Sequence, residues 1–257
     1  MISELEIFGN RAGSPGPDGP ASGYVLRVNG RTLLIDCGPG VLVGLTKAGV
    51  VDEIDAVIIS HRHADHSADL APFAYHQAFP APKEPLPLFA PTGFAEYIAS
   101  LDNVHGIPTL DTLRQPIASQ FTLHEVEPGE SFSASGVTVD TVAAKHPVPC
   151  LSMRFPEAGL VYTADTAKTP DLVRLATNAS VLLAEATYES PDGHDFETHG
   201  HMSGFEAGEL ATEAAVGRLV LTHLEDFRRA EQTKRNAASR YNGDVSVAQV
   251  GHRILLS

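Results

Sequence analysis

Four short apolar runs of this chain end in histidine or aspartate, and this pattern constrains the possible folds more than any other feature. The first run, residues 56–60, leads directly into the hexad His-Arg-His-Ala-Asp-His at positions 61–66. Three later runs, rich in branched residues, are followed by His146, Asp165 and His223. Such runs are typical of buried strands, and functional side chains at strand ends are typical of α/β proteins. The sequence therefore predicts one site to which several strands contribute their end residues.

Segments with strand periodicity alternate with segments of helical periodicity along the chain. We expect strands at residues 5–8, 24–28, 32–35, 56–59, 86–89, 121–124, 137–142, 160–163, 181–184 and 219–222. Helices are expected at residues 41–48, 92–101, 171–177, 203–216 and 226–241. The first half is rich in expected hairpins, whereas the second half alternates strand and helix. The Gly- and Pro-rich stretch 9–23 is expected to be an ordered loop, and residues 78–87 a surface loop.

The length and composition favour one globular domain. The chain has 257 residues, 43% hydrophobic and 19% charged, which is ordinary for a soluble protein. There is no linker and no repeat, so a single α/β domain over residues 1–257 with two stacked sheets is expected. No apolar run approaches the ~20 residues of a membrane span, and the first residues do not resemble a signal peptide. We therefore expect a cytoplasmic protein without a membrane partner.

The net charge of the chain limits the kinds of partner that it is expected to bind. Lys and Arg total 18 against 32 Asp and Glu, a formal net charge of −14. Nucleic acid is therefore a disfavoured partner, because affinity for phosphate backbones rests on basic side chains; bound divalent metals would offset some of this charge. Cys37 and Cys150 are the only cysteines. Two cysteines are too few for a disulfide framework or a four-cysteine zinc site. We expect both to be reduced, buried thiols.

The hexad is a dense set of metal ligands. His61 and His63 are spaced to face one metal, while Asp65 and His66 can face another. Imidazole and carboxylate ligands suit zinc, which we expect first, and also manganese or iron. The alternative is a solvated polar loop with incidental histidines. A lone histidine or aspartate after a strand is usually a cap or turn residue, so the repetition over four strands carries the argument.

In this order, His-x-His-x-Asp-His followed by His, Asp and His at strand ends resembles the metallo-β-lactamase superfamily. The run Asp-Cys-Gly-Pro-Gly at 36–40 is similar to that superfamily's first motif, so the resemblance extends over nearly the whole chain. It implies a four-layer αββα sandwich and two divalent metal ions. By that resemblance, one metal takes His61, His63 and His146, the other takes Asp65, His66 and His223, and Asp165 bridges them. Asp36 would then support the ligand loop, or simply form a turn at a strand end.

Two metal ions imply hydrolytic chemistry. Two neighbouring cations lower the pKa of a bridging water to about 7, and two carboxylates against four positive charges leave a site that suits an anionic ester. Attack by a metal-bound hydroxide would then depend on Asp65, and a separate acid would protonate the leaving oxygen. His201 is the candidate acid, because Ser203 is a plausible helix N-cap and places it at the positive end of a helix. His199 is the alternative, and Glu185 is expected to orient the His201 ring.

Two further motifs refine the resemblance. Glu-Ala-Thr at 185–187 and His-Met-Ser-Gly at 201–204 resemble the branch that contains ribonuclease Z. The chain departs from that branch in having Ala184 where a histidine is usual. Only 19 residues separate His146 from Asp165, which leaves room for a hairpin but not for a tRNA-gripping arm. Residues 16–26 are similar to actinobacterial cyclic-nucleotide phosphodiesterases of this fold, although this run also reads as a plain loop.

These observations favour a dinuclear metal phosphodiesterase that acts on a small anionic ester such as a cyclic nucleotide. The alternatives are another hydrolase of the same fold (lactonase, thioesterase, arylsulfatase or β-lactamase), a ribonuclease Z-like RNA-processing enzyme, and a metal-binding protein without catalysis. The substrate is expected to depend on the loops at 75–85 and 101–113. A homodimer is compatible with the sequence.

Overall fold

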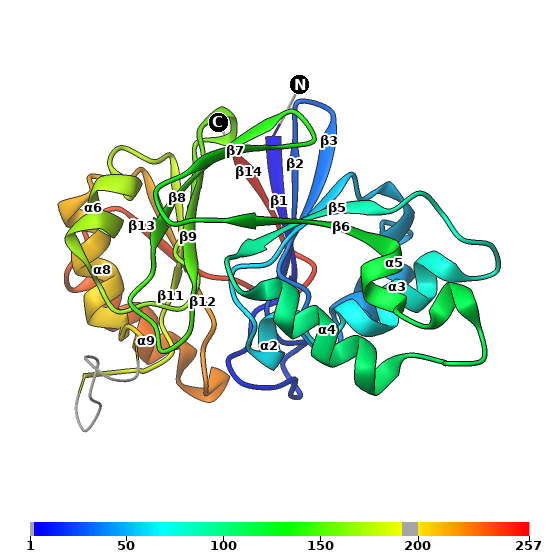
Figure 1. Ribbon diagram of the computed structural model, residues 1–257. Helices are drawn as coiled ribbons and strands as arrows, with labels where there is room; N and C mark the ends of the chain where they lie inside the picture. The colour runs from blue at the N-terminus through cyan, green and yellow to red at the C-terminus, as the bar shows by residue number, and fades with distance from the viewer. Residues whose placement is uncertain (1–2, 192–199, 257) are drawn as a thin grey trace.

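Two seven-stranded sheets pack face to face in the computed structural model, which describes residues 3–191 and 200–256 (Figure 1). The first sheet contains, in order, β14 (Arg253–Leu256), β1 (Ser3–Gly9), β2 (Gly23–Val28), β3 (Arg31–Ile35), β4 (Ala56–Ile58), β5 (Leu86–Pro91) and β6 (Phe121–Val126). The second contains β13 (Asp244–Val247), β12 (Arg218–Thr222), β11 (Val181–Glu185), β10 (Leu160–Tyr162), β9 (Leu151–Phe155), β8 (Val137–Ala143) and β7 (Ser131–Ala134).

Helices cover the outer face of each sheet, as Figure 1 shows. The first sheet is accompanied by α1 (Val41–Ala48), α2 (Ala64–Ser67), α3 (Leu70–Ala78), α4 (Phe94–His105) and α5 (Pro116–Gln120). The second sheet is covered by α6 (Pro170–Ala176), α8 (Gly204–Glu213) and α9 (Ala230–Ala238). None of the described helices has the length and apolarity needed to cross a membrane.

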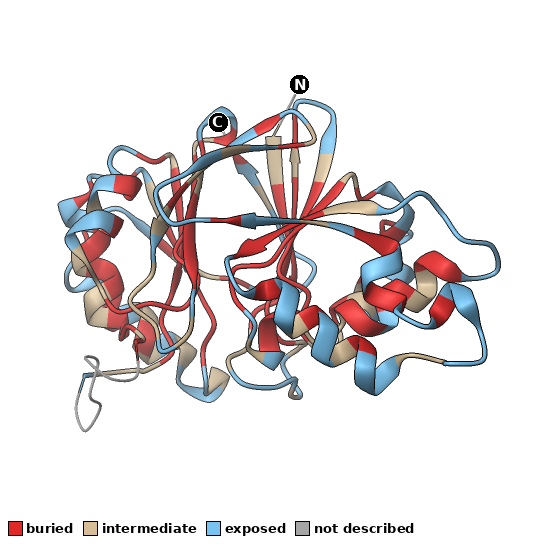
Figure 2. Ribbon diagram, viewed as in Figure 1, coloured by how far each residue is buried: buried red, intermediate tan, exposed pale blue. Residues whose placement is uncertain are grey.

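Alternation of side chains along the strands builds the layers. Leu33 and Ile35 of β3 belong to the apolar cluster that both sheets share, whereas Leu34 between them packs in the cluster beneath the helices of the first sheet. In the second sheet, Leu183 faces the shared cluster and Leu182 faces α6 and α8. Both faces of the central strands are therefore buried (Figure 2). This arrangement confirms the expected four-layer αββα sandwich.

Each half of the chain begins with antiparallel strands and continues with parallel ones. β1, β2 and β3 pair antiparallel, and β3 to β6 pair parallel. β7 to β10 repeat the antiparallel pattern, and β10 to β13 the parallel one. The predicted contrast between a hairpin-rich half and an alternating half was therefore wrong. Because parallel strands end at the same edge of a sheet, this topology brings the functional strand ends together.

Several segments differ from the sequence expectations. Residues 75–78 end α3 instead of lying in a loop, and residues 86–87 begin β5. Pro72 argues against a helix in this segment, because proline has no backbone N–H. It lies in the first turn of α3, where the backbone N–H would have no partner within the helix. The helix expected at 226–241 starts four residues later as α9, after a short 3-10 turn (Phe227–Arg229). The helix expected at 92–101 runs from Phe94 to His105 as α4, so the supposed loop 101–113 begins in a helix.

Candidate metal centre

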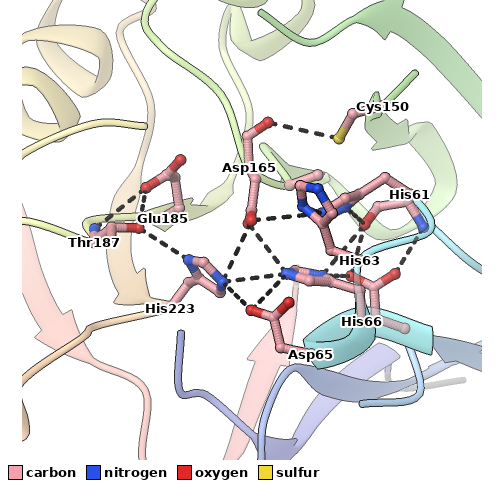
Figure 3. A network of polar contacts seen from close by, with 12 residues as sticks. His61, His63, Asp65, His66, Cys150, Asp165, Glu185, Thr187 and His223 are labelled. Carbon is pink, nitrogen blue, oxygen red and sulfur yellow. Dashed lines mark hydrogen bonds and ion pairs between the residues drawn. The ribbon is translucent and has the colours of Figure 1, made fainter. Parts of the chain in front are cut away.

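The seven side chains predicted as metal ligands converge at the strand ends of the two sheets. Figure 3 labels all of them except His146. β4 leads into His61 and His63, and α2 carries Asp65 and His66. The segments that follow β8, β10 and β12 carry His146, Asp165 and His223. The side chains come from both halves of the chain, so the site depends on the packing of one sheet against the other.

One ligand group consists of His61, His63, His146 and Asp165, whose ligand atoms all lie within 4.8 Å of one another. His63 Nδ1 lies 3.0 Å from His61 Nε2 and 3.0 Å from His146 Nε2. Asp165 Oδ2 lies 3.6 Å from His61 Nε2. Tetrahedral ligands about 2.0–2.1 Å from a zinc ion lie about 3.3 Å from one another. The spacing of these atoms fits one such cation.

The second group consists of Asp65, His66, Asp165 and His223, within the same limit of 4.8 Å. His223 Nε2 lies 3.1 Å from Asp65 Oδ2 and 3.2 Å from His66 Nε2. Asp165 Oδ1 is buried and lies 3.3 Å from His66 Nε2, yet it accepts no well-aligned hydrogen bond from the described part of the chain. A buried carboxylate oxygen that lacks a good hydrogen bond is costly unless a cation compensates it. Asp165 belongs to both groups, as expected of a bridging ligand, and the donor set fits a pair of divalent ions.

Outer partners fix the orientation of the histidine rings. In four of the five rings Nδ1 faces an oxygen, which leaves Nε2 directed to the centre: His66 Nδ1 lies 2.7 Å from Asp36 Oδ2, His223 Nδ1 lies 2.9 Å from Thr187 Oγ1, His61 Nδ1 lies 3.0 Å from Ser60 Oγ, and His146 Nδ1 lies 3.1 Å from Gly200 O. With the proton on Nδ1, the Nε2 lone pair of these four is free for a metal. An outer acceptor behind the imidazole is typical of metal-ligating histidines.

Asp36 lies in a turn at a strand end and also contacts candidate ligands. Both roles considered for it from the sequence therefore apply. Its backbone φ is 58°, a left-handed value that also occurs at His223 and Ala164 beside the site. Its carboxylate accepts hydrogen bonds from Ser60 N at 2.7 Å, Ser60 Oγ at 2.9 Å and Tyr162 OH at 2.8 Å, besides facing His66. Residues with such strained φ values persist where the surrounding structure holds them, often at functional sites.

Burial and mutual charge set the protonation of the site. Burial, and then the neighbouring His66, hold the pKa of His61 well below its usual range. Burial also opposes the charged form of His66, but the carboxylates of Asp165 and Asp36 raise its pKa overall. Burial alone would raise the pKa of Asp165, yet the histidines around it, His223 first, lower it well below the usual range. The centre is therefore built around ionised carboxylates.

The candidate acid pair lies at the edge of this centre. His201 Nδ1 lies 2.9 Å from Glu185 Oε1, and Ser203 caps α8 through a capping box with Glu206. Burial acts against the imidazolium, but Glu185 outweighs it and raises the pKa of His201 to about 9. His199, the alternative acid, lies outside the described residues. Ala184, where the ribonuclease Z branch usually has histidine, is packed in the cluster beneath α6 and α8.

Thr187 joins the acid pair to the metal ligands, a role that the sequence did not reveal. Its Oγ1 donates to Glu185 Oε2 at 2.6 Å and lies 2.9 Å from His223 Nδ1. Because a hydroxyl has one proton to donate, it accepts the N–H of His223. The Glu-Ala-Thr motif contained this residue, but only the fold shows that its hydroxyl touches a ligand from another strand.

The Gly- and Pro-rich loop forms one wall of the site. Gly13 N donates to Asp65 Oδ2 at 2.7 Å. Arg11 holds this loop in place, since its guanidinium donates to Ser14 O, Asp18 and Glu225 O. The expectation of an ordered loop is confirmed. The contact with Asp65 could not be predicted from the residue types, because a backbone N–H makes it.

A cavity of about 330 Å³ opens onto the centre. Its walls consist of ligand residues, His201, Thr187 and four further residues: Ala12, Gly13, Tyr188 and Glu225. Residues 75–85 and 101–113 do not appear among its described lining residues. The outer wall of this cavity comes from the loop at 9–23 and the segments after β11 and β12, so the role of residues 75–85 and 101–113 in substrate choice stays a prediction.

Comparison with known proteins agrees with this geometry. The family model of the Beta-lactamase superfamily domain matches residues 31–224. The probable metallo-hydrolase YhfI of Bacillus subtilis is 30% identical over 96% of this chain and 98% of its own. The crystal structure of that metallo-β-lactamase-fold protein covers 99% of both chains with a TM-score of 0.85 at 28% identity. A ribonuclease Z of Mycobacterium bovis is 28% identical over 98% of this chain and 97% of its own.

A more distant solved structure shares the fold. The crystal structure of a new diphosphatase from the PhnP family covers 99% of this chain and 97% of its own, with a TM-score of 0.75 at 18% identity.

Proposed function

This chain belongs to the beta-lactamase superfamily and is a metal-dependent hydrolase, and on that premise we propose that it is a dinuclear phosphodiesterase for small substrates such as cyclic nucleotides. The observation that carries the proposal is the placement of two ligand groups, which share Asp165, beside the His201–Glu185 pair in one cavity. Relatives named ribonuclease Z and a structural neighbour named a diphosphatase support phosphoester chemistry.

The ligand residues would hold two divalent ions, with His61, His63 and His146 around one, Asp65, His66 and His223 around the other, and Asp165 between them. Such ions supply Lewis acidity and activate water for attack. Five neutral imidazoles and two carboxylates leave the loaded centre with a net positive charge, which attracts an anionic phosphodiester. Asp65 is held by Gly13 N, so one of its carboxylate oxygens keeps a fixed direction toward His223.

His201 is the proposed acid for the leaving oxygen. Its Nδ1 faces Glu185, so Nε2 is the atom that holds the transferable proton. Glu185 stabilises the charged ring and fixes its tautomer. Cleavage of an unactivated phosphodiester expels a strongly basic alkoxide, and a positioned acid that protonates the leaving oxygen assists this step. The pair therefore favours a phosphodiester over the lactonase, thioesterase and β-lactamase alternatives.

A small substrate fits better than RNA. The net charge of −14 repels a polyanion, and β9 and β10 with their 3-10 turn fill the interval between His146 and Asp165 as a hairpin. This interval thus leaves no room for an arm that could grip tRNA.

Hydrolysis of bis(p-nitrophenyl) phosphate by protein loaded with zinc or with manganese tests the proposal. We expect turnover that Asp65→Ala abolishes and that the surface variant Asp52→Ala retains. Turnover by neither metal form, in protein shown to bind the ions, would reject phosphodiester chemistry.

Leaving-group dependence tests the acid. His201→Ala should lower the rate about 10²- to 10⁴-fold for alkyl leaving groups, the range typical of general acid catalysis, and much less for p-nitrophenol. Equal losses for both kinds of leaving group would remove His201 from this role.

A further inference from the structure

Glu225 lies at the mouth of the cavity over the candidate metal centre. It lines the cavity of about 330 Å³ over the metal centre and two adjoining cavities of about 370 and 570 Å³. Its backbone N contacts Thr187 O at 3.3 Å, and its backbone O accepts from Arg11 at 3.4 Å. The exposed carboxylate itself has no hydrogen-bond or ion-pair partner among residues 3–191 and 200–256.

The positive side chains around these cavities are already paired. Arg11 lies 3.0 Å from Asp18, Arg228 lies 2.8 Å from Asp226, and Arg229 lies 2.7 Å from Glu189. Each guanidinium is thus balanced by a carboxylate of its own. Among the residues that the structure describes, the charge of Glu225 is therefore not balanced by a positive side chain of this mouth.

Glu225 lines the same cavity as His201, the proposed proton donor to the leaving oxygen. It follows His223 by two residues, and the His223 ring stacks on His201 with centroids 5.6 Å apart. Tyr188, whose ring packs edge-on against His201 at 5.9 Å, lines the same cavity. A leaving group that takes its proton from His201 Nε2 would therefore share this cavity with Tyr188 and Glu225.

We infer that Glu225 is a specificity-determining residue that selects phosphodiesters whose leaving group carries hydroxyl or amino donors and no further negative charge. The inference rests on the proposed function. An ionised carboxylate accepts hydrogen bonds from sugar hydroxyls or base N–H groups, and it repels a second phosphate on the same group. Within a nucleic acid chain the leaving nucleoside carries such a phosphate unless it is the terminal one, whereas in a cyclic nucleotide the leaving oxygen belongs to a sugar that carries no second phosphate.

The test compares thymidylyl-thymidine, which has one negative charge, with the same compound carrying a terminal phosphate at either its 3′ or its 5′ end. The quantity measured is the ratio of kcat/KM between the unphosphorylated and the phosphorylated substrate, because any general loss of activity in a variant cancels in this ratio. Glu225→Gln removes the charge and Glu225→Lys reverses it. The matched control Glu53→Lys makes the same reversal on an exposed residue of the 3-10 turn Val51–Glu53.

We expect the wild-type protein to prefer the unphosphorylated dinucleotide over at least one of the phosphorylated forms. Glu225→Gln should reduce this preference about fivefold, which corresponds to about 1 kcal/mol, and Glu225→Lys should reduce it further or invert it. Glu53→Lys should keep the wild-type ratio. Equilibrium binding of the corresponding phosphorothioates to the metal-loaded protein should show the same order, independently of turnover, and the effect should weaken as salt screens the exposed charge.

Unchanged ratios in Glu225→Lys, with turnover of bis(p-nitrophenyl) phosphate intact in the wild-type protein, would overturn the role of Glu225 and leave the proposed function standing. An equal change in Glu53→Lys would show a general field effect and would also overturn it. Absence of hydrolysis of every phosphodiester by the wild-type protein would reject both proposals together.

Discussion

The hydroxyl of Thr187 should govern the affinity of the centre for metal. Thr187→Val keeps the shape of the side chain but removes the oxygen that faces His223 Nδ1 at 2.9 Å and donates to Glu185 at 2.6 Å. His223 then has a buried N–H without a partner, and its ring loses the contact that fixes the tautomer. Hydrogen bonds to charged groups contribute about 1.5–3 kcal/mol, which corresponds to about 10- to 100-fold in a binding constant. Loss of an outer partner of a ligating histidine typically has the same effect.

Competition with a chromogenic chelator measures this affinity directly. We expect Thr187→Val to bind zinc about 10- to 100-fold more weakly than the wild-type protein, and Thr187→Ser to restore most of the affinity because it keeps the hydroxyl. The matched control is Thr141→Val, another buried threonine, whose hydroxyl donates to Glu130 O at 2.8 Å outside the site. Wild-type affinity in Thr187→Val would refute the proposed link between Thr187 and the ligand His223.

Three other perturbations have defined outcomes. Asp36→Asn replaces one carboxylate oxygen, which accepts hydrogen bonds, by an amide NH2 group, which can only donate them. The free energy of unfolding measured in urea should therefore fall by about 3 kcal/mol or more. A fall of less than about 1 kcal/mol would contradict the network around Asp36. Removal of both metal ions with a chelator should lower the melting temperature by about 10–20 °C, since two ions, each present at 100 times its Kd, together stabilise the fold by about 5.4 kcal/mol; an unchanged melting temperature would mean that no ion was bound. Arg11→Ala should free the loop that holds Gly13 N against Asp65, and hydrogen exchange should therefore speed up at Gly13 while amides of α6 stay as slow as in the wild-type protein.

The candidate ligand residues could be located in the sequence because their position depends on short-range features. Each follows a run of branched apolar residues, and the spacing within the hexad is local. The same apolar runs predicted the order of the four layers. A strand that is apolar on both faces is buried on both, so its sheet must be covered by helices on one side and by the other sheet on the other. The hairpin between His146 and Asp165 was also predictable, because 19 residues allow little else.

The remaining features depend on contacts between segments far apart in the chain. β13 and β14 are short and of mixed composition, so only pairing with β12 and β1 makes them strands. Gly13 acts through its backbone, which no side-chain pattern reveals. Thr187 and Glu225 gain their roles from the packing of segments after β11 and β12 around one cavity. No local pattern specifies which side chains will line a shared space.

The most direct test of the account is a titration of metal-free protein with zinc or manganese while hydrolysis of bis(p-nitrophenyl) phosphate is followed. The account predicts that activity rises with added metal and reaches its plateau at about two ions per chain, as expected of a two-metal hydrolase. A plateau at one ion per chain, or full metal binding without hydrolysis, would contradict it.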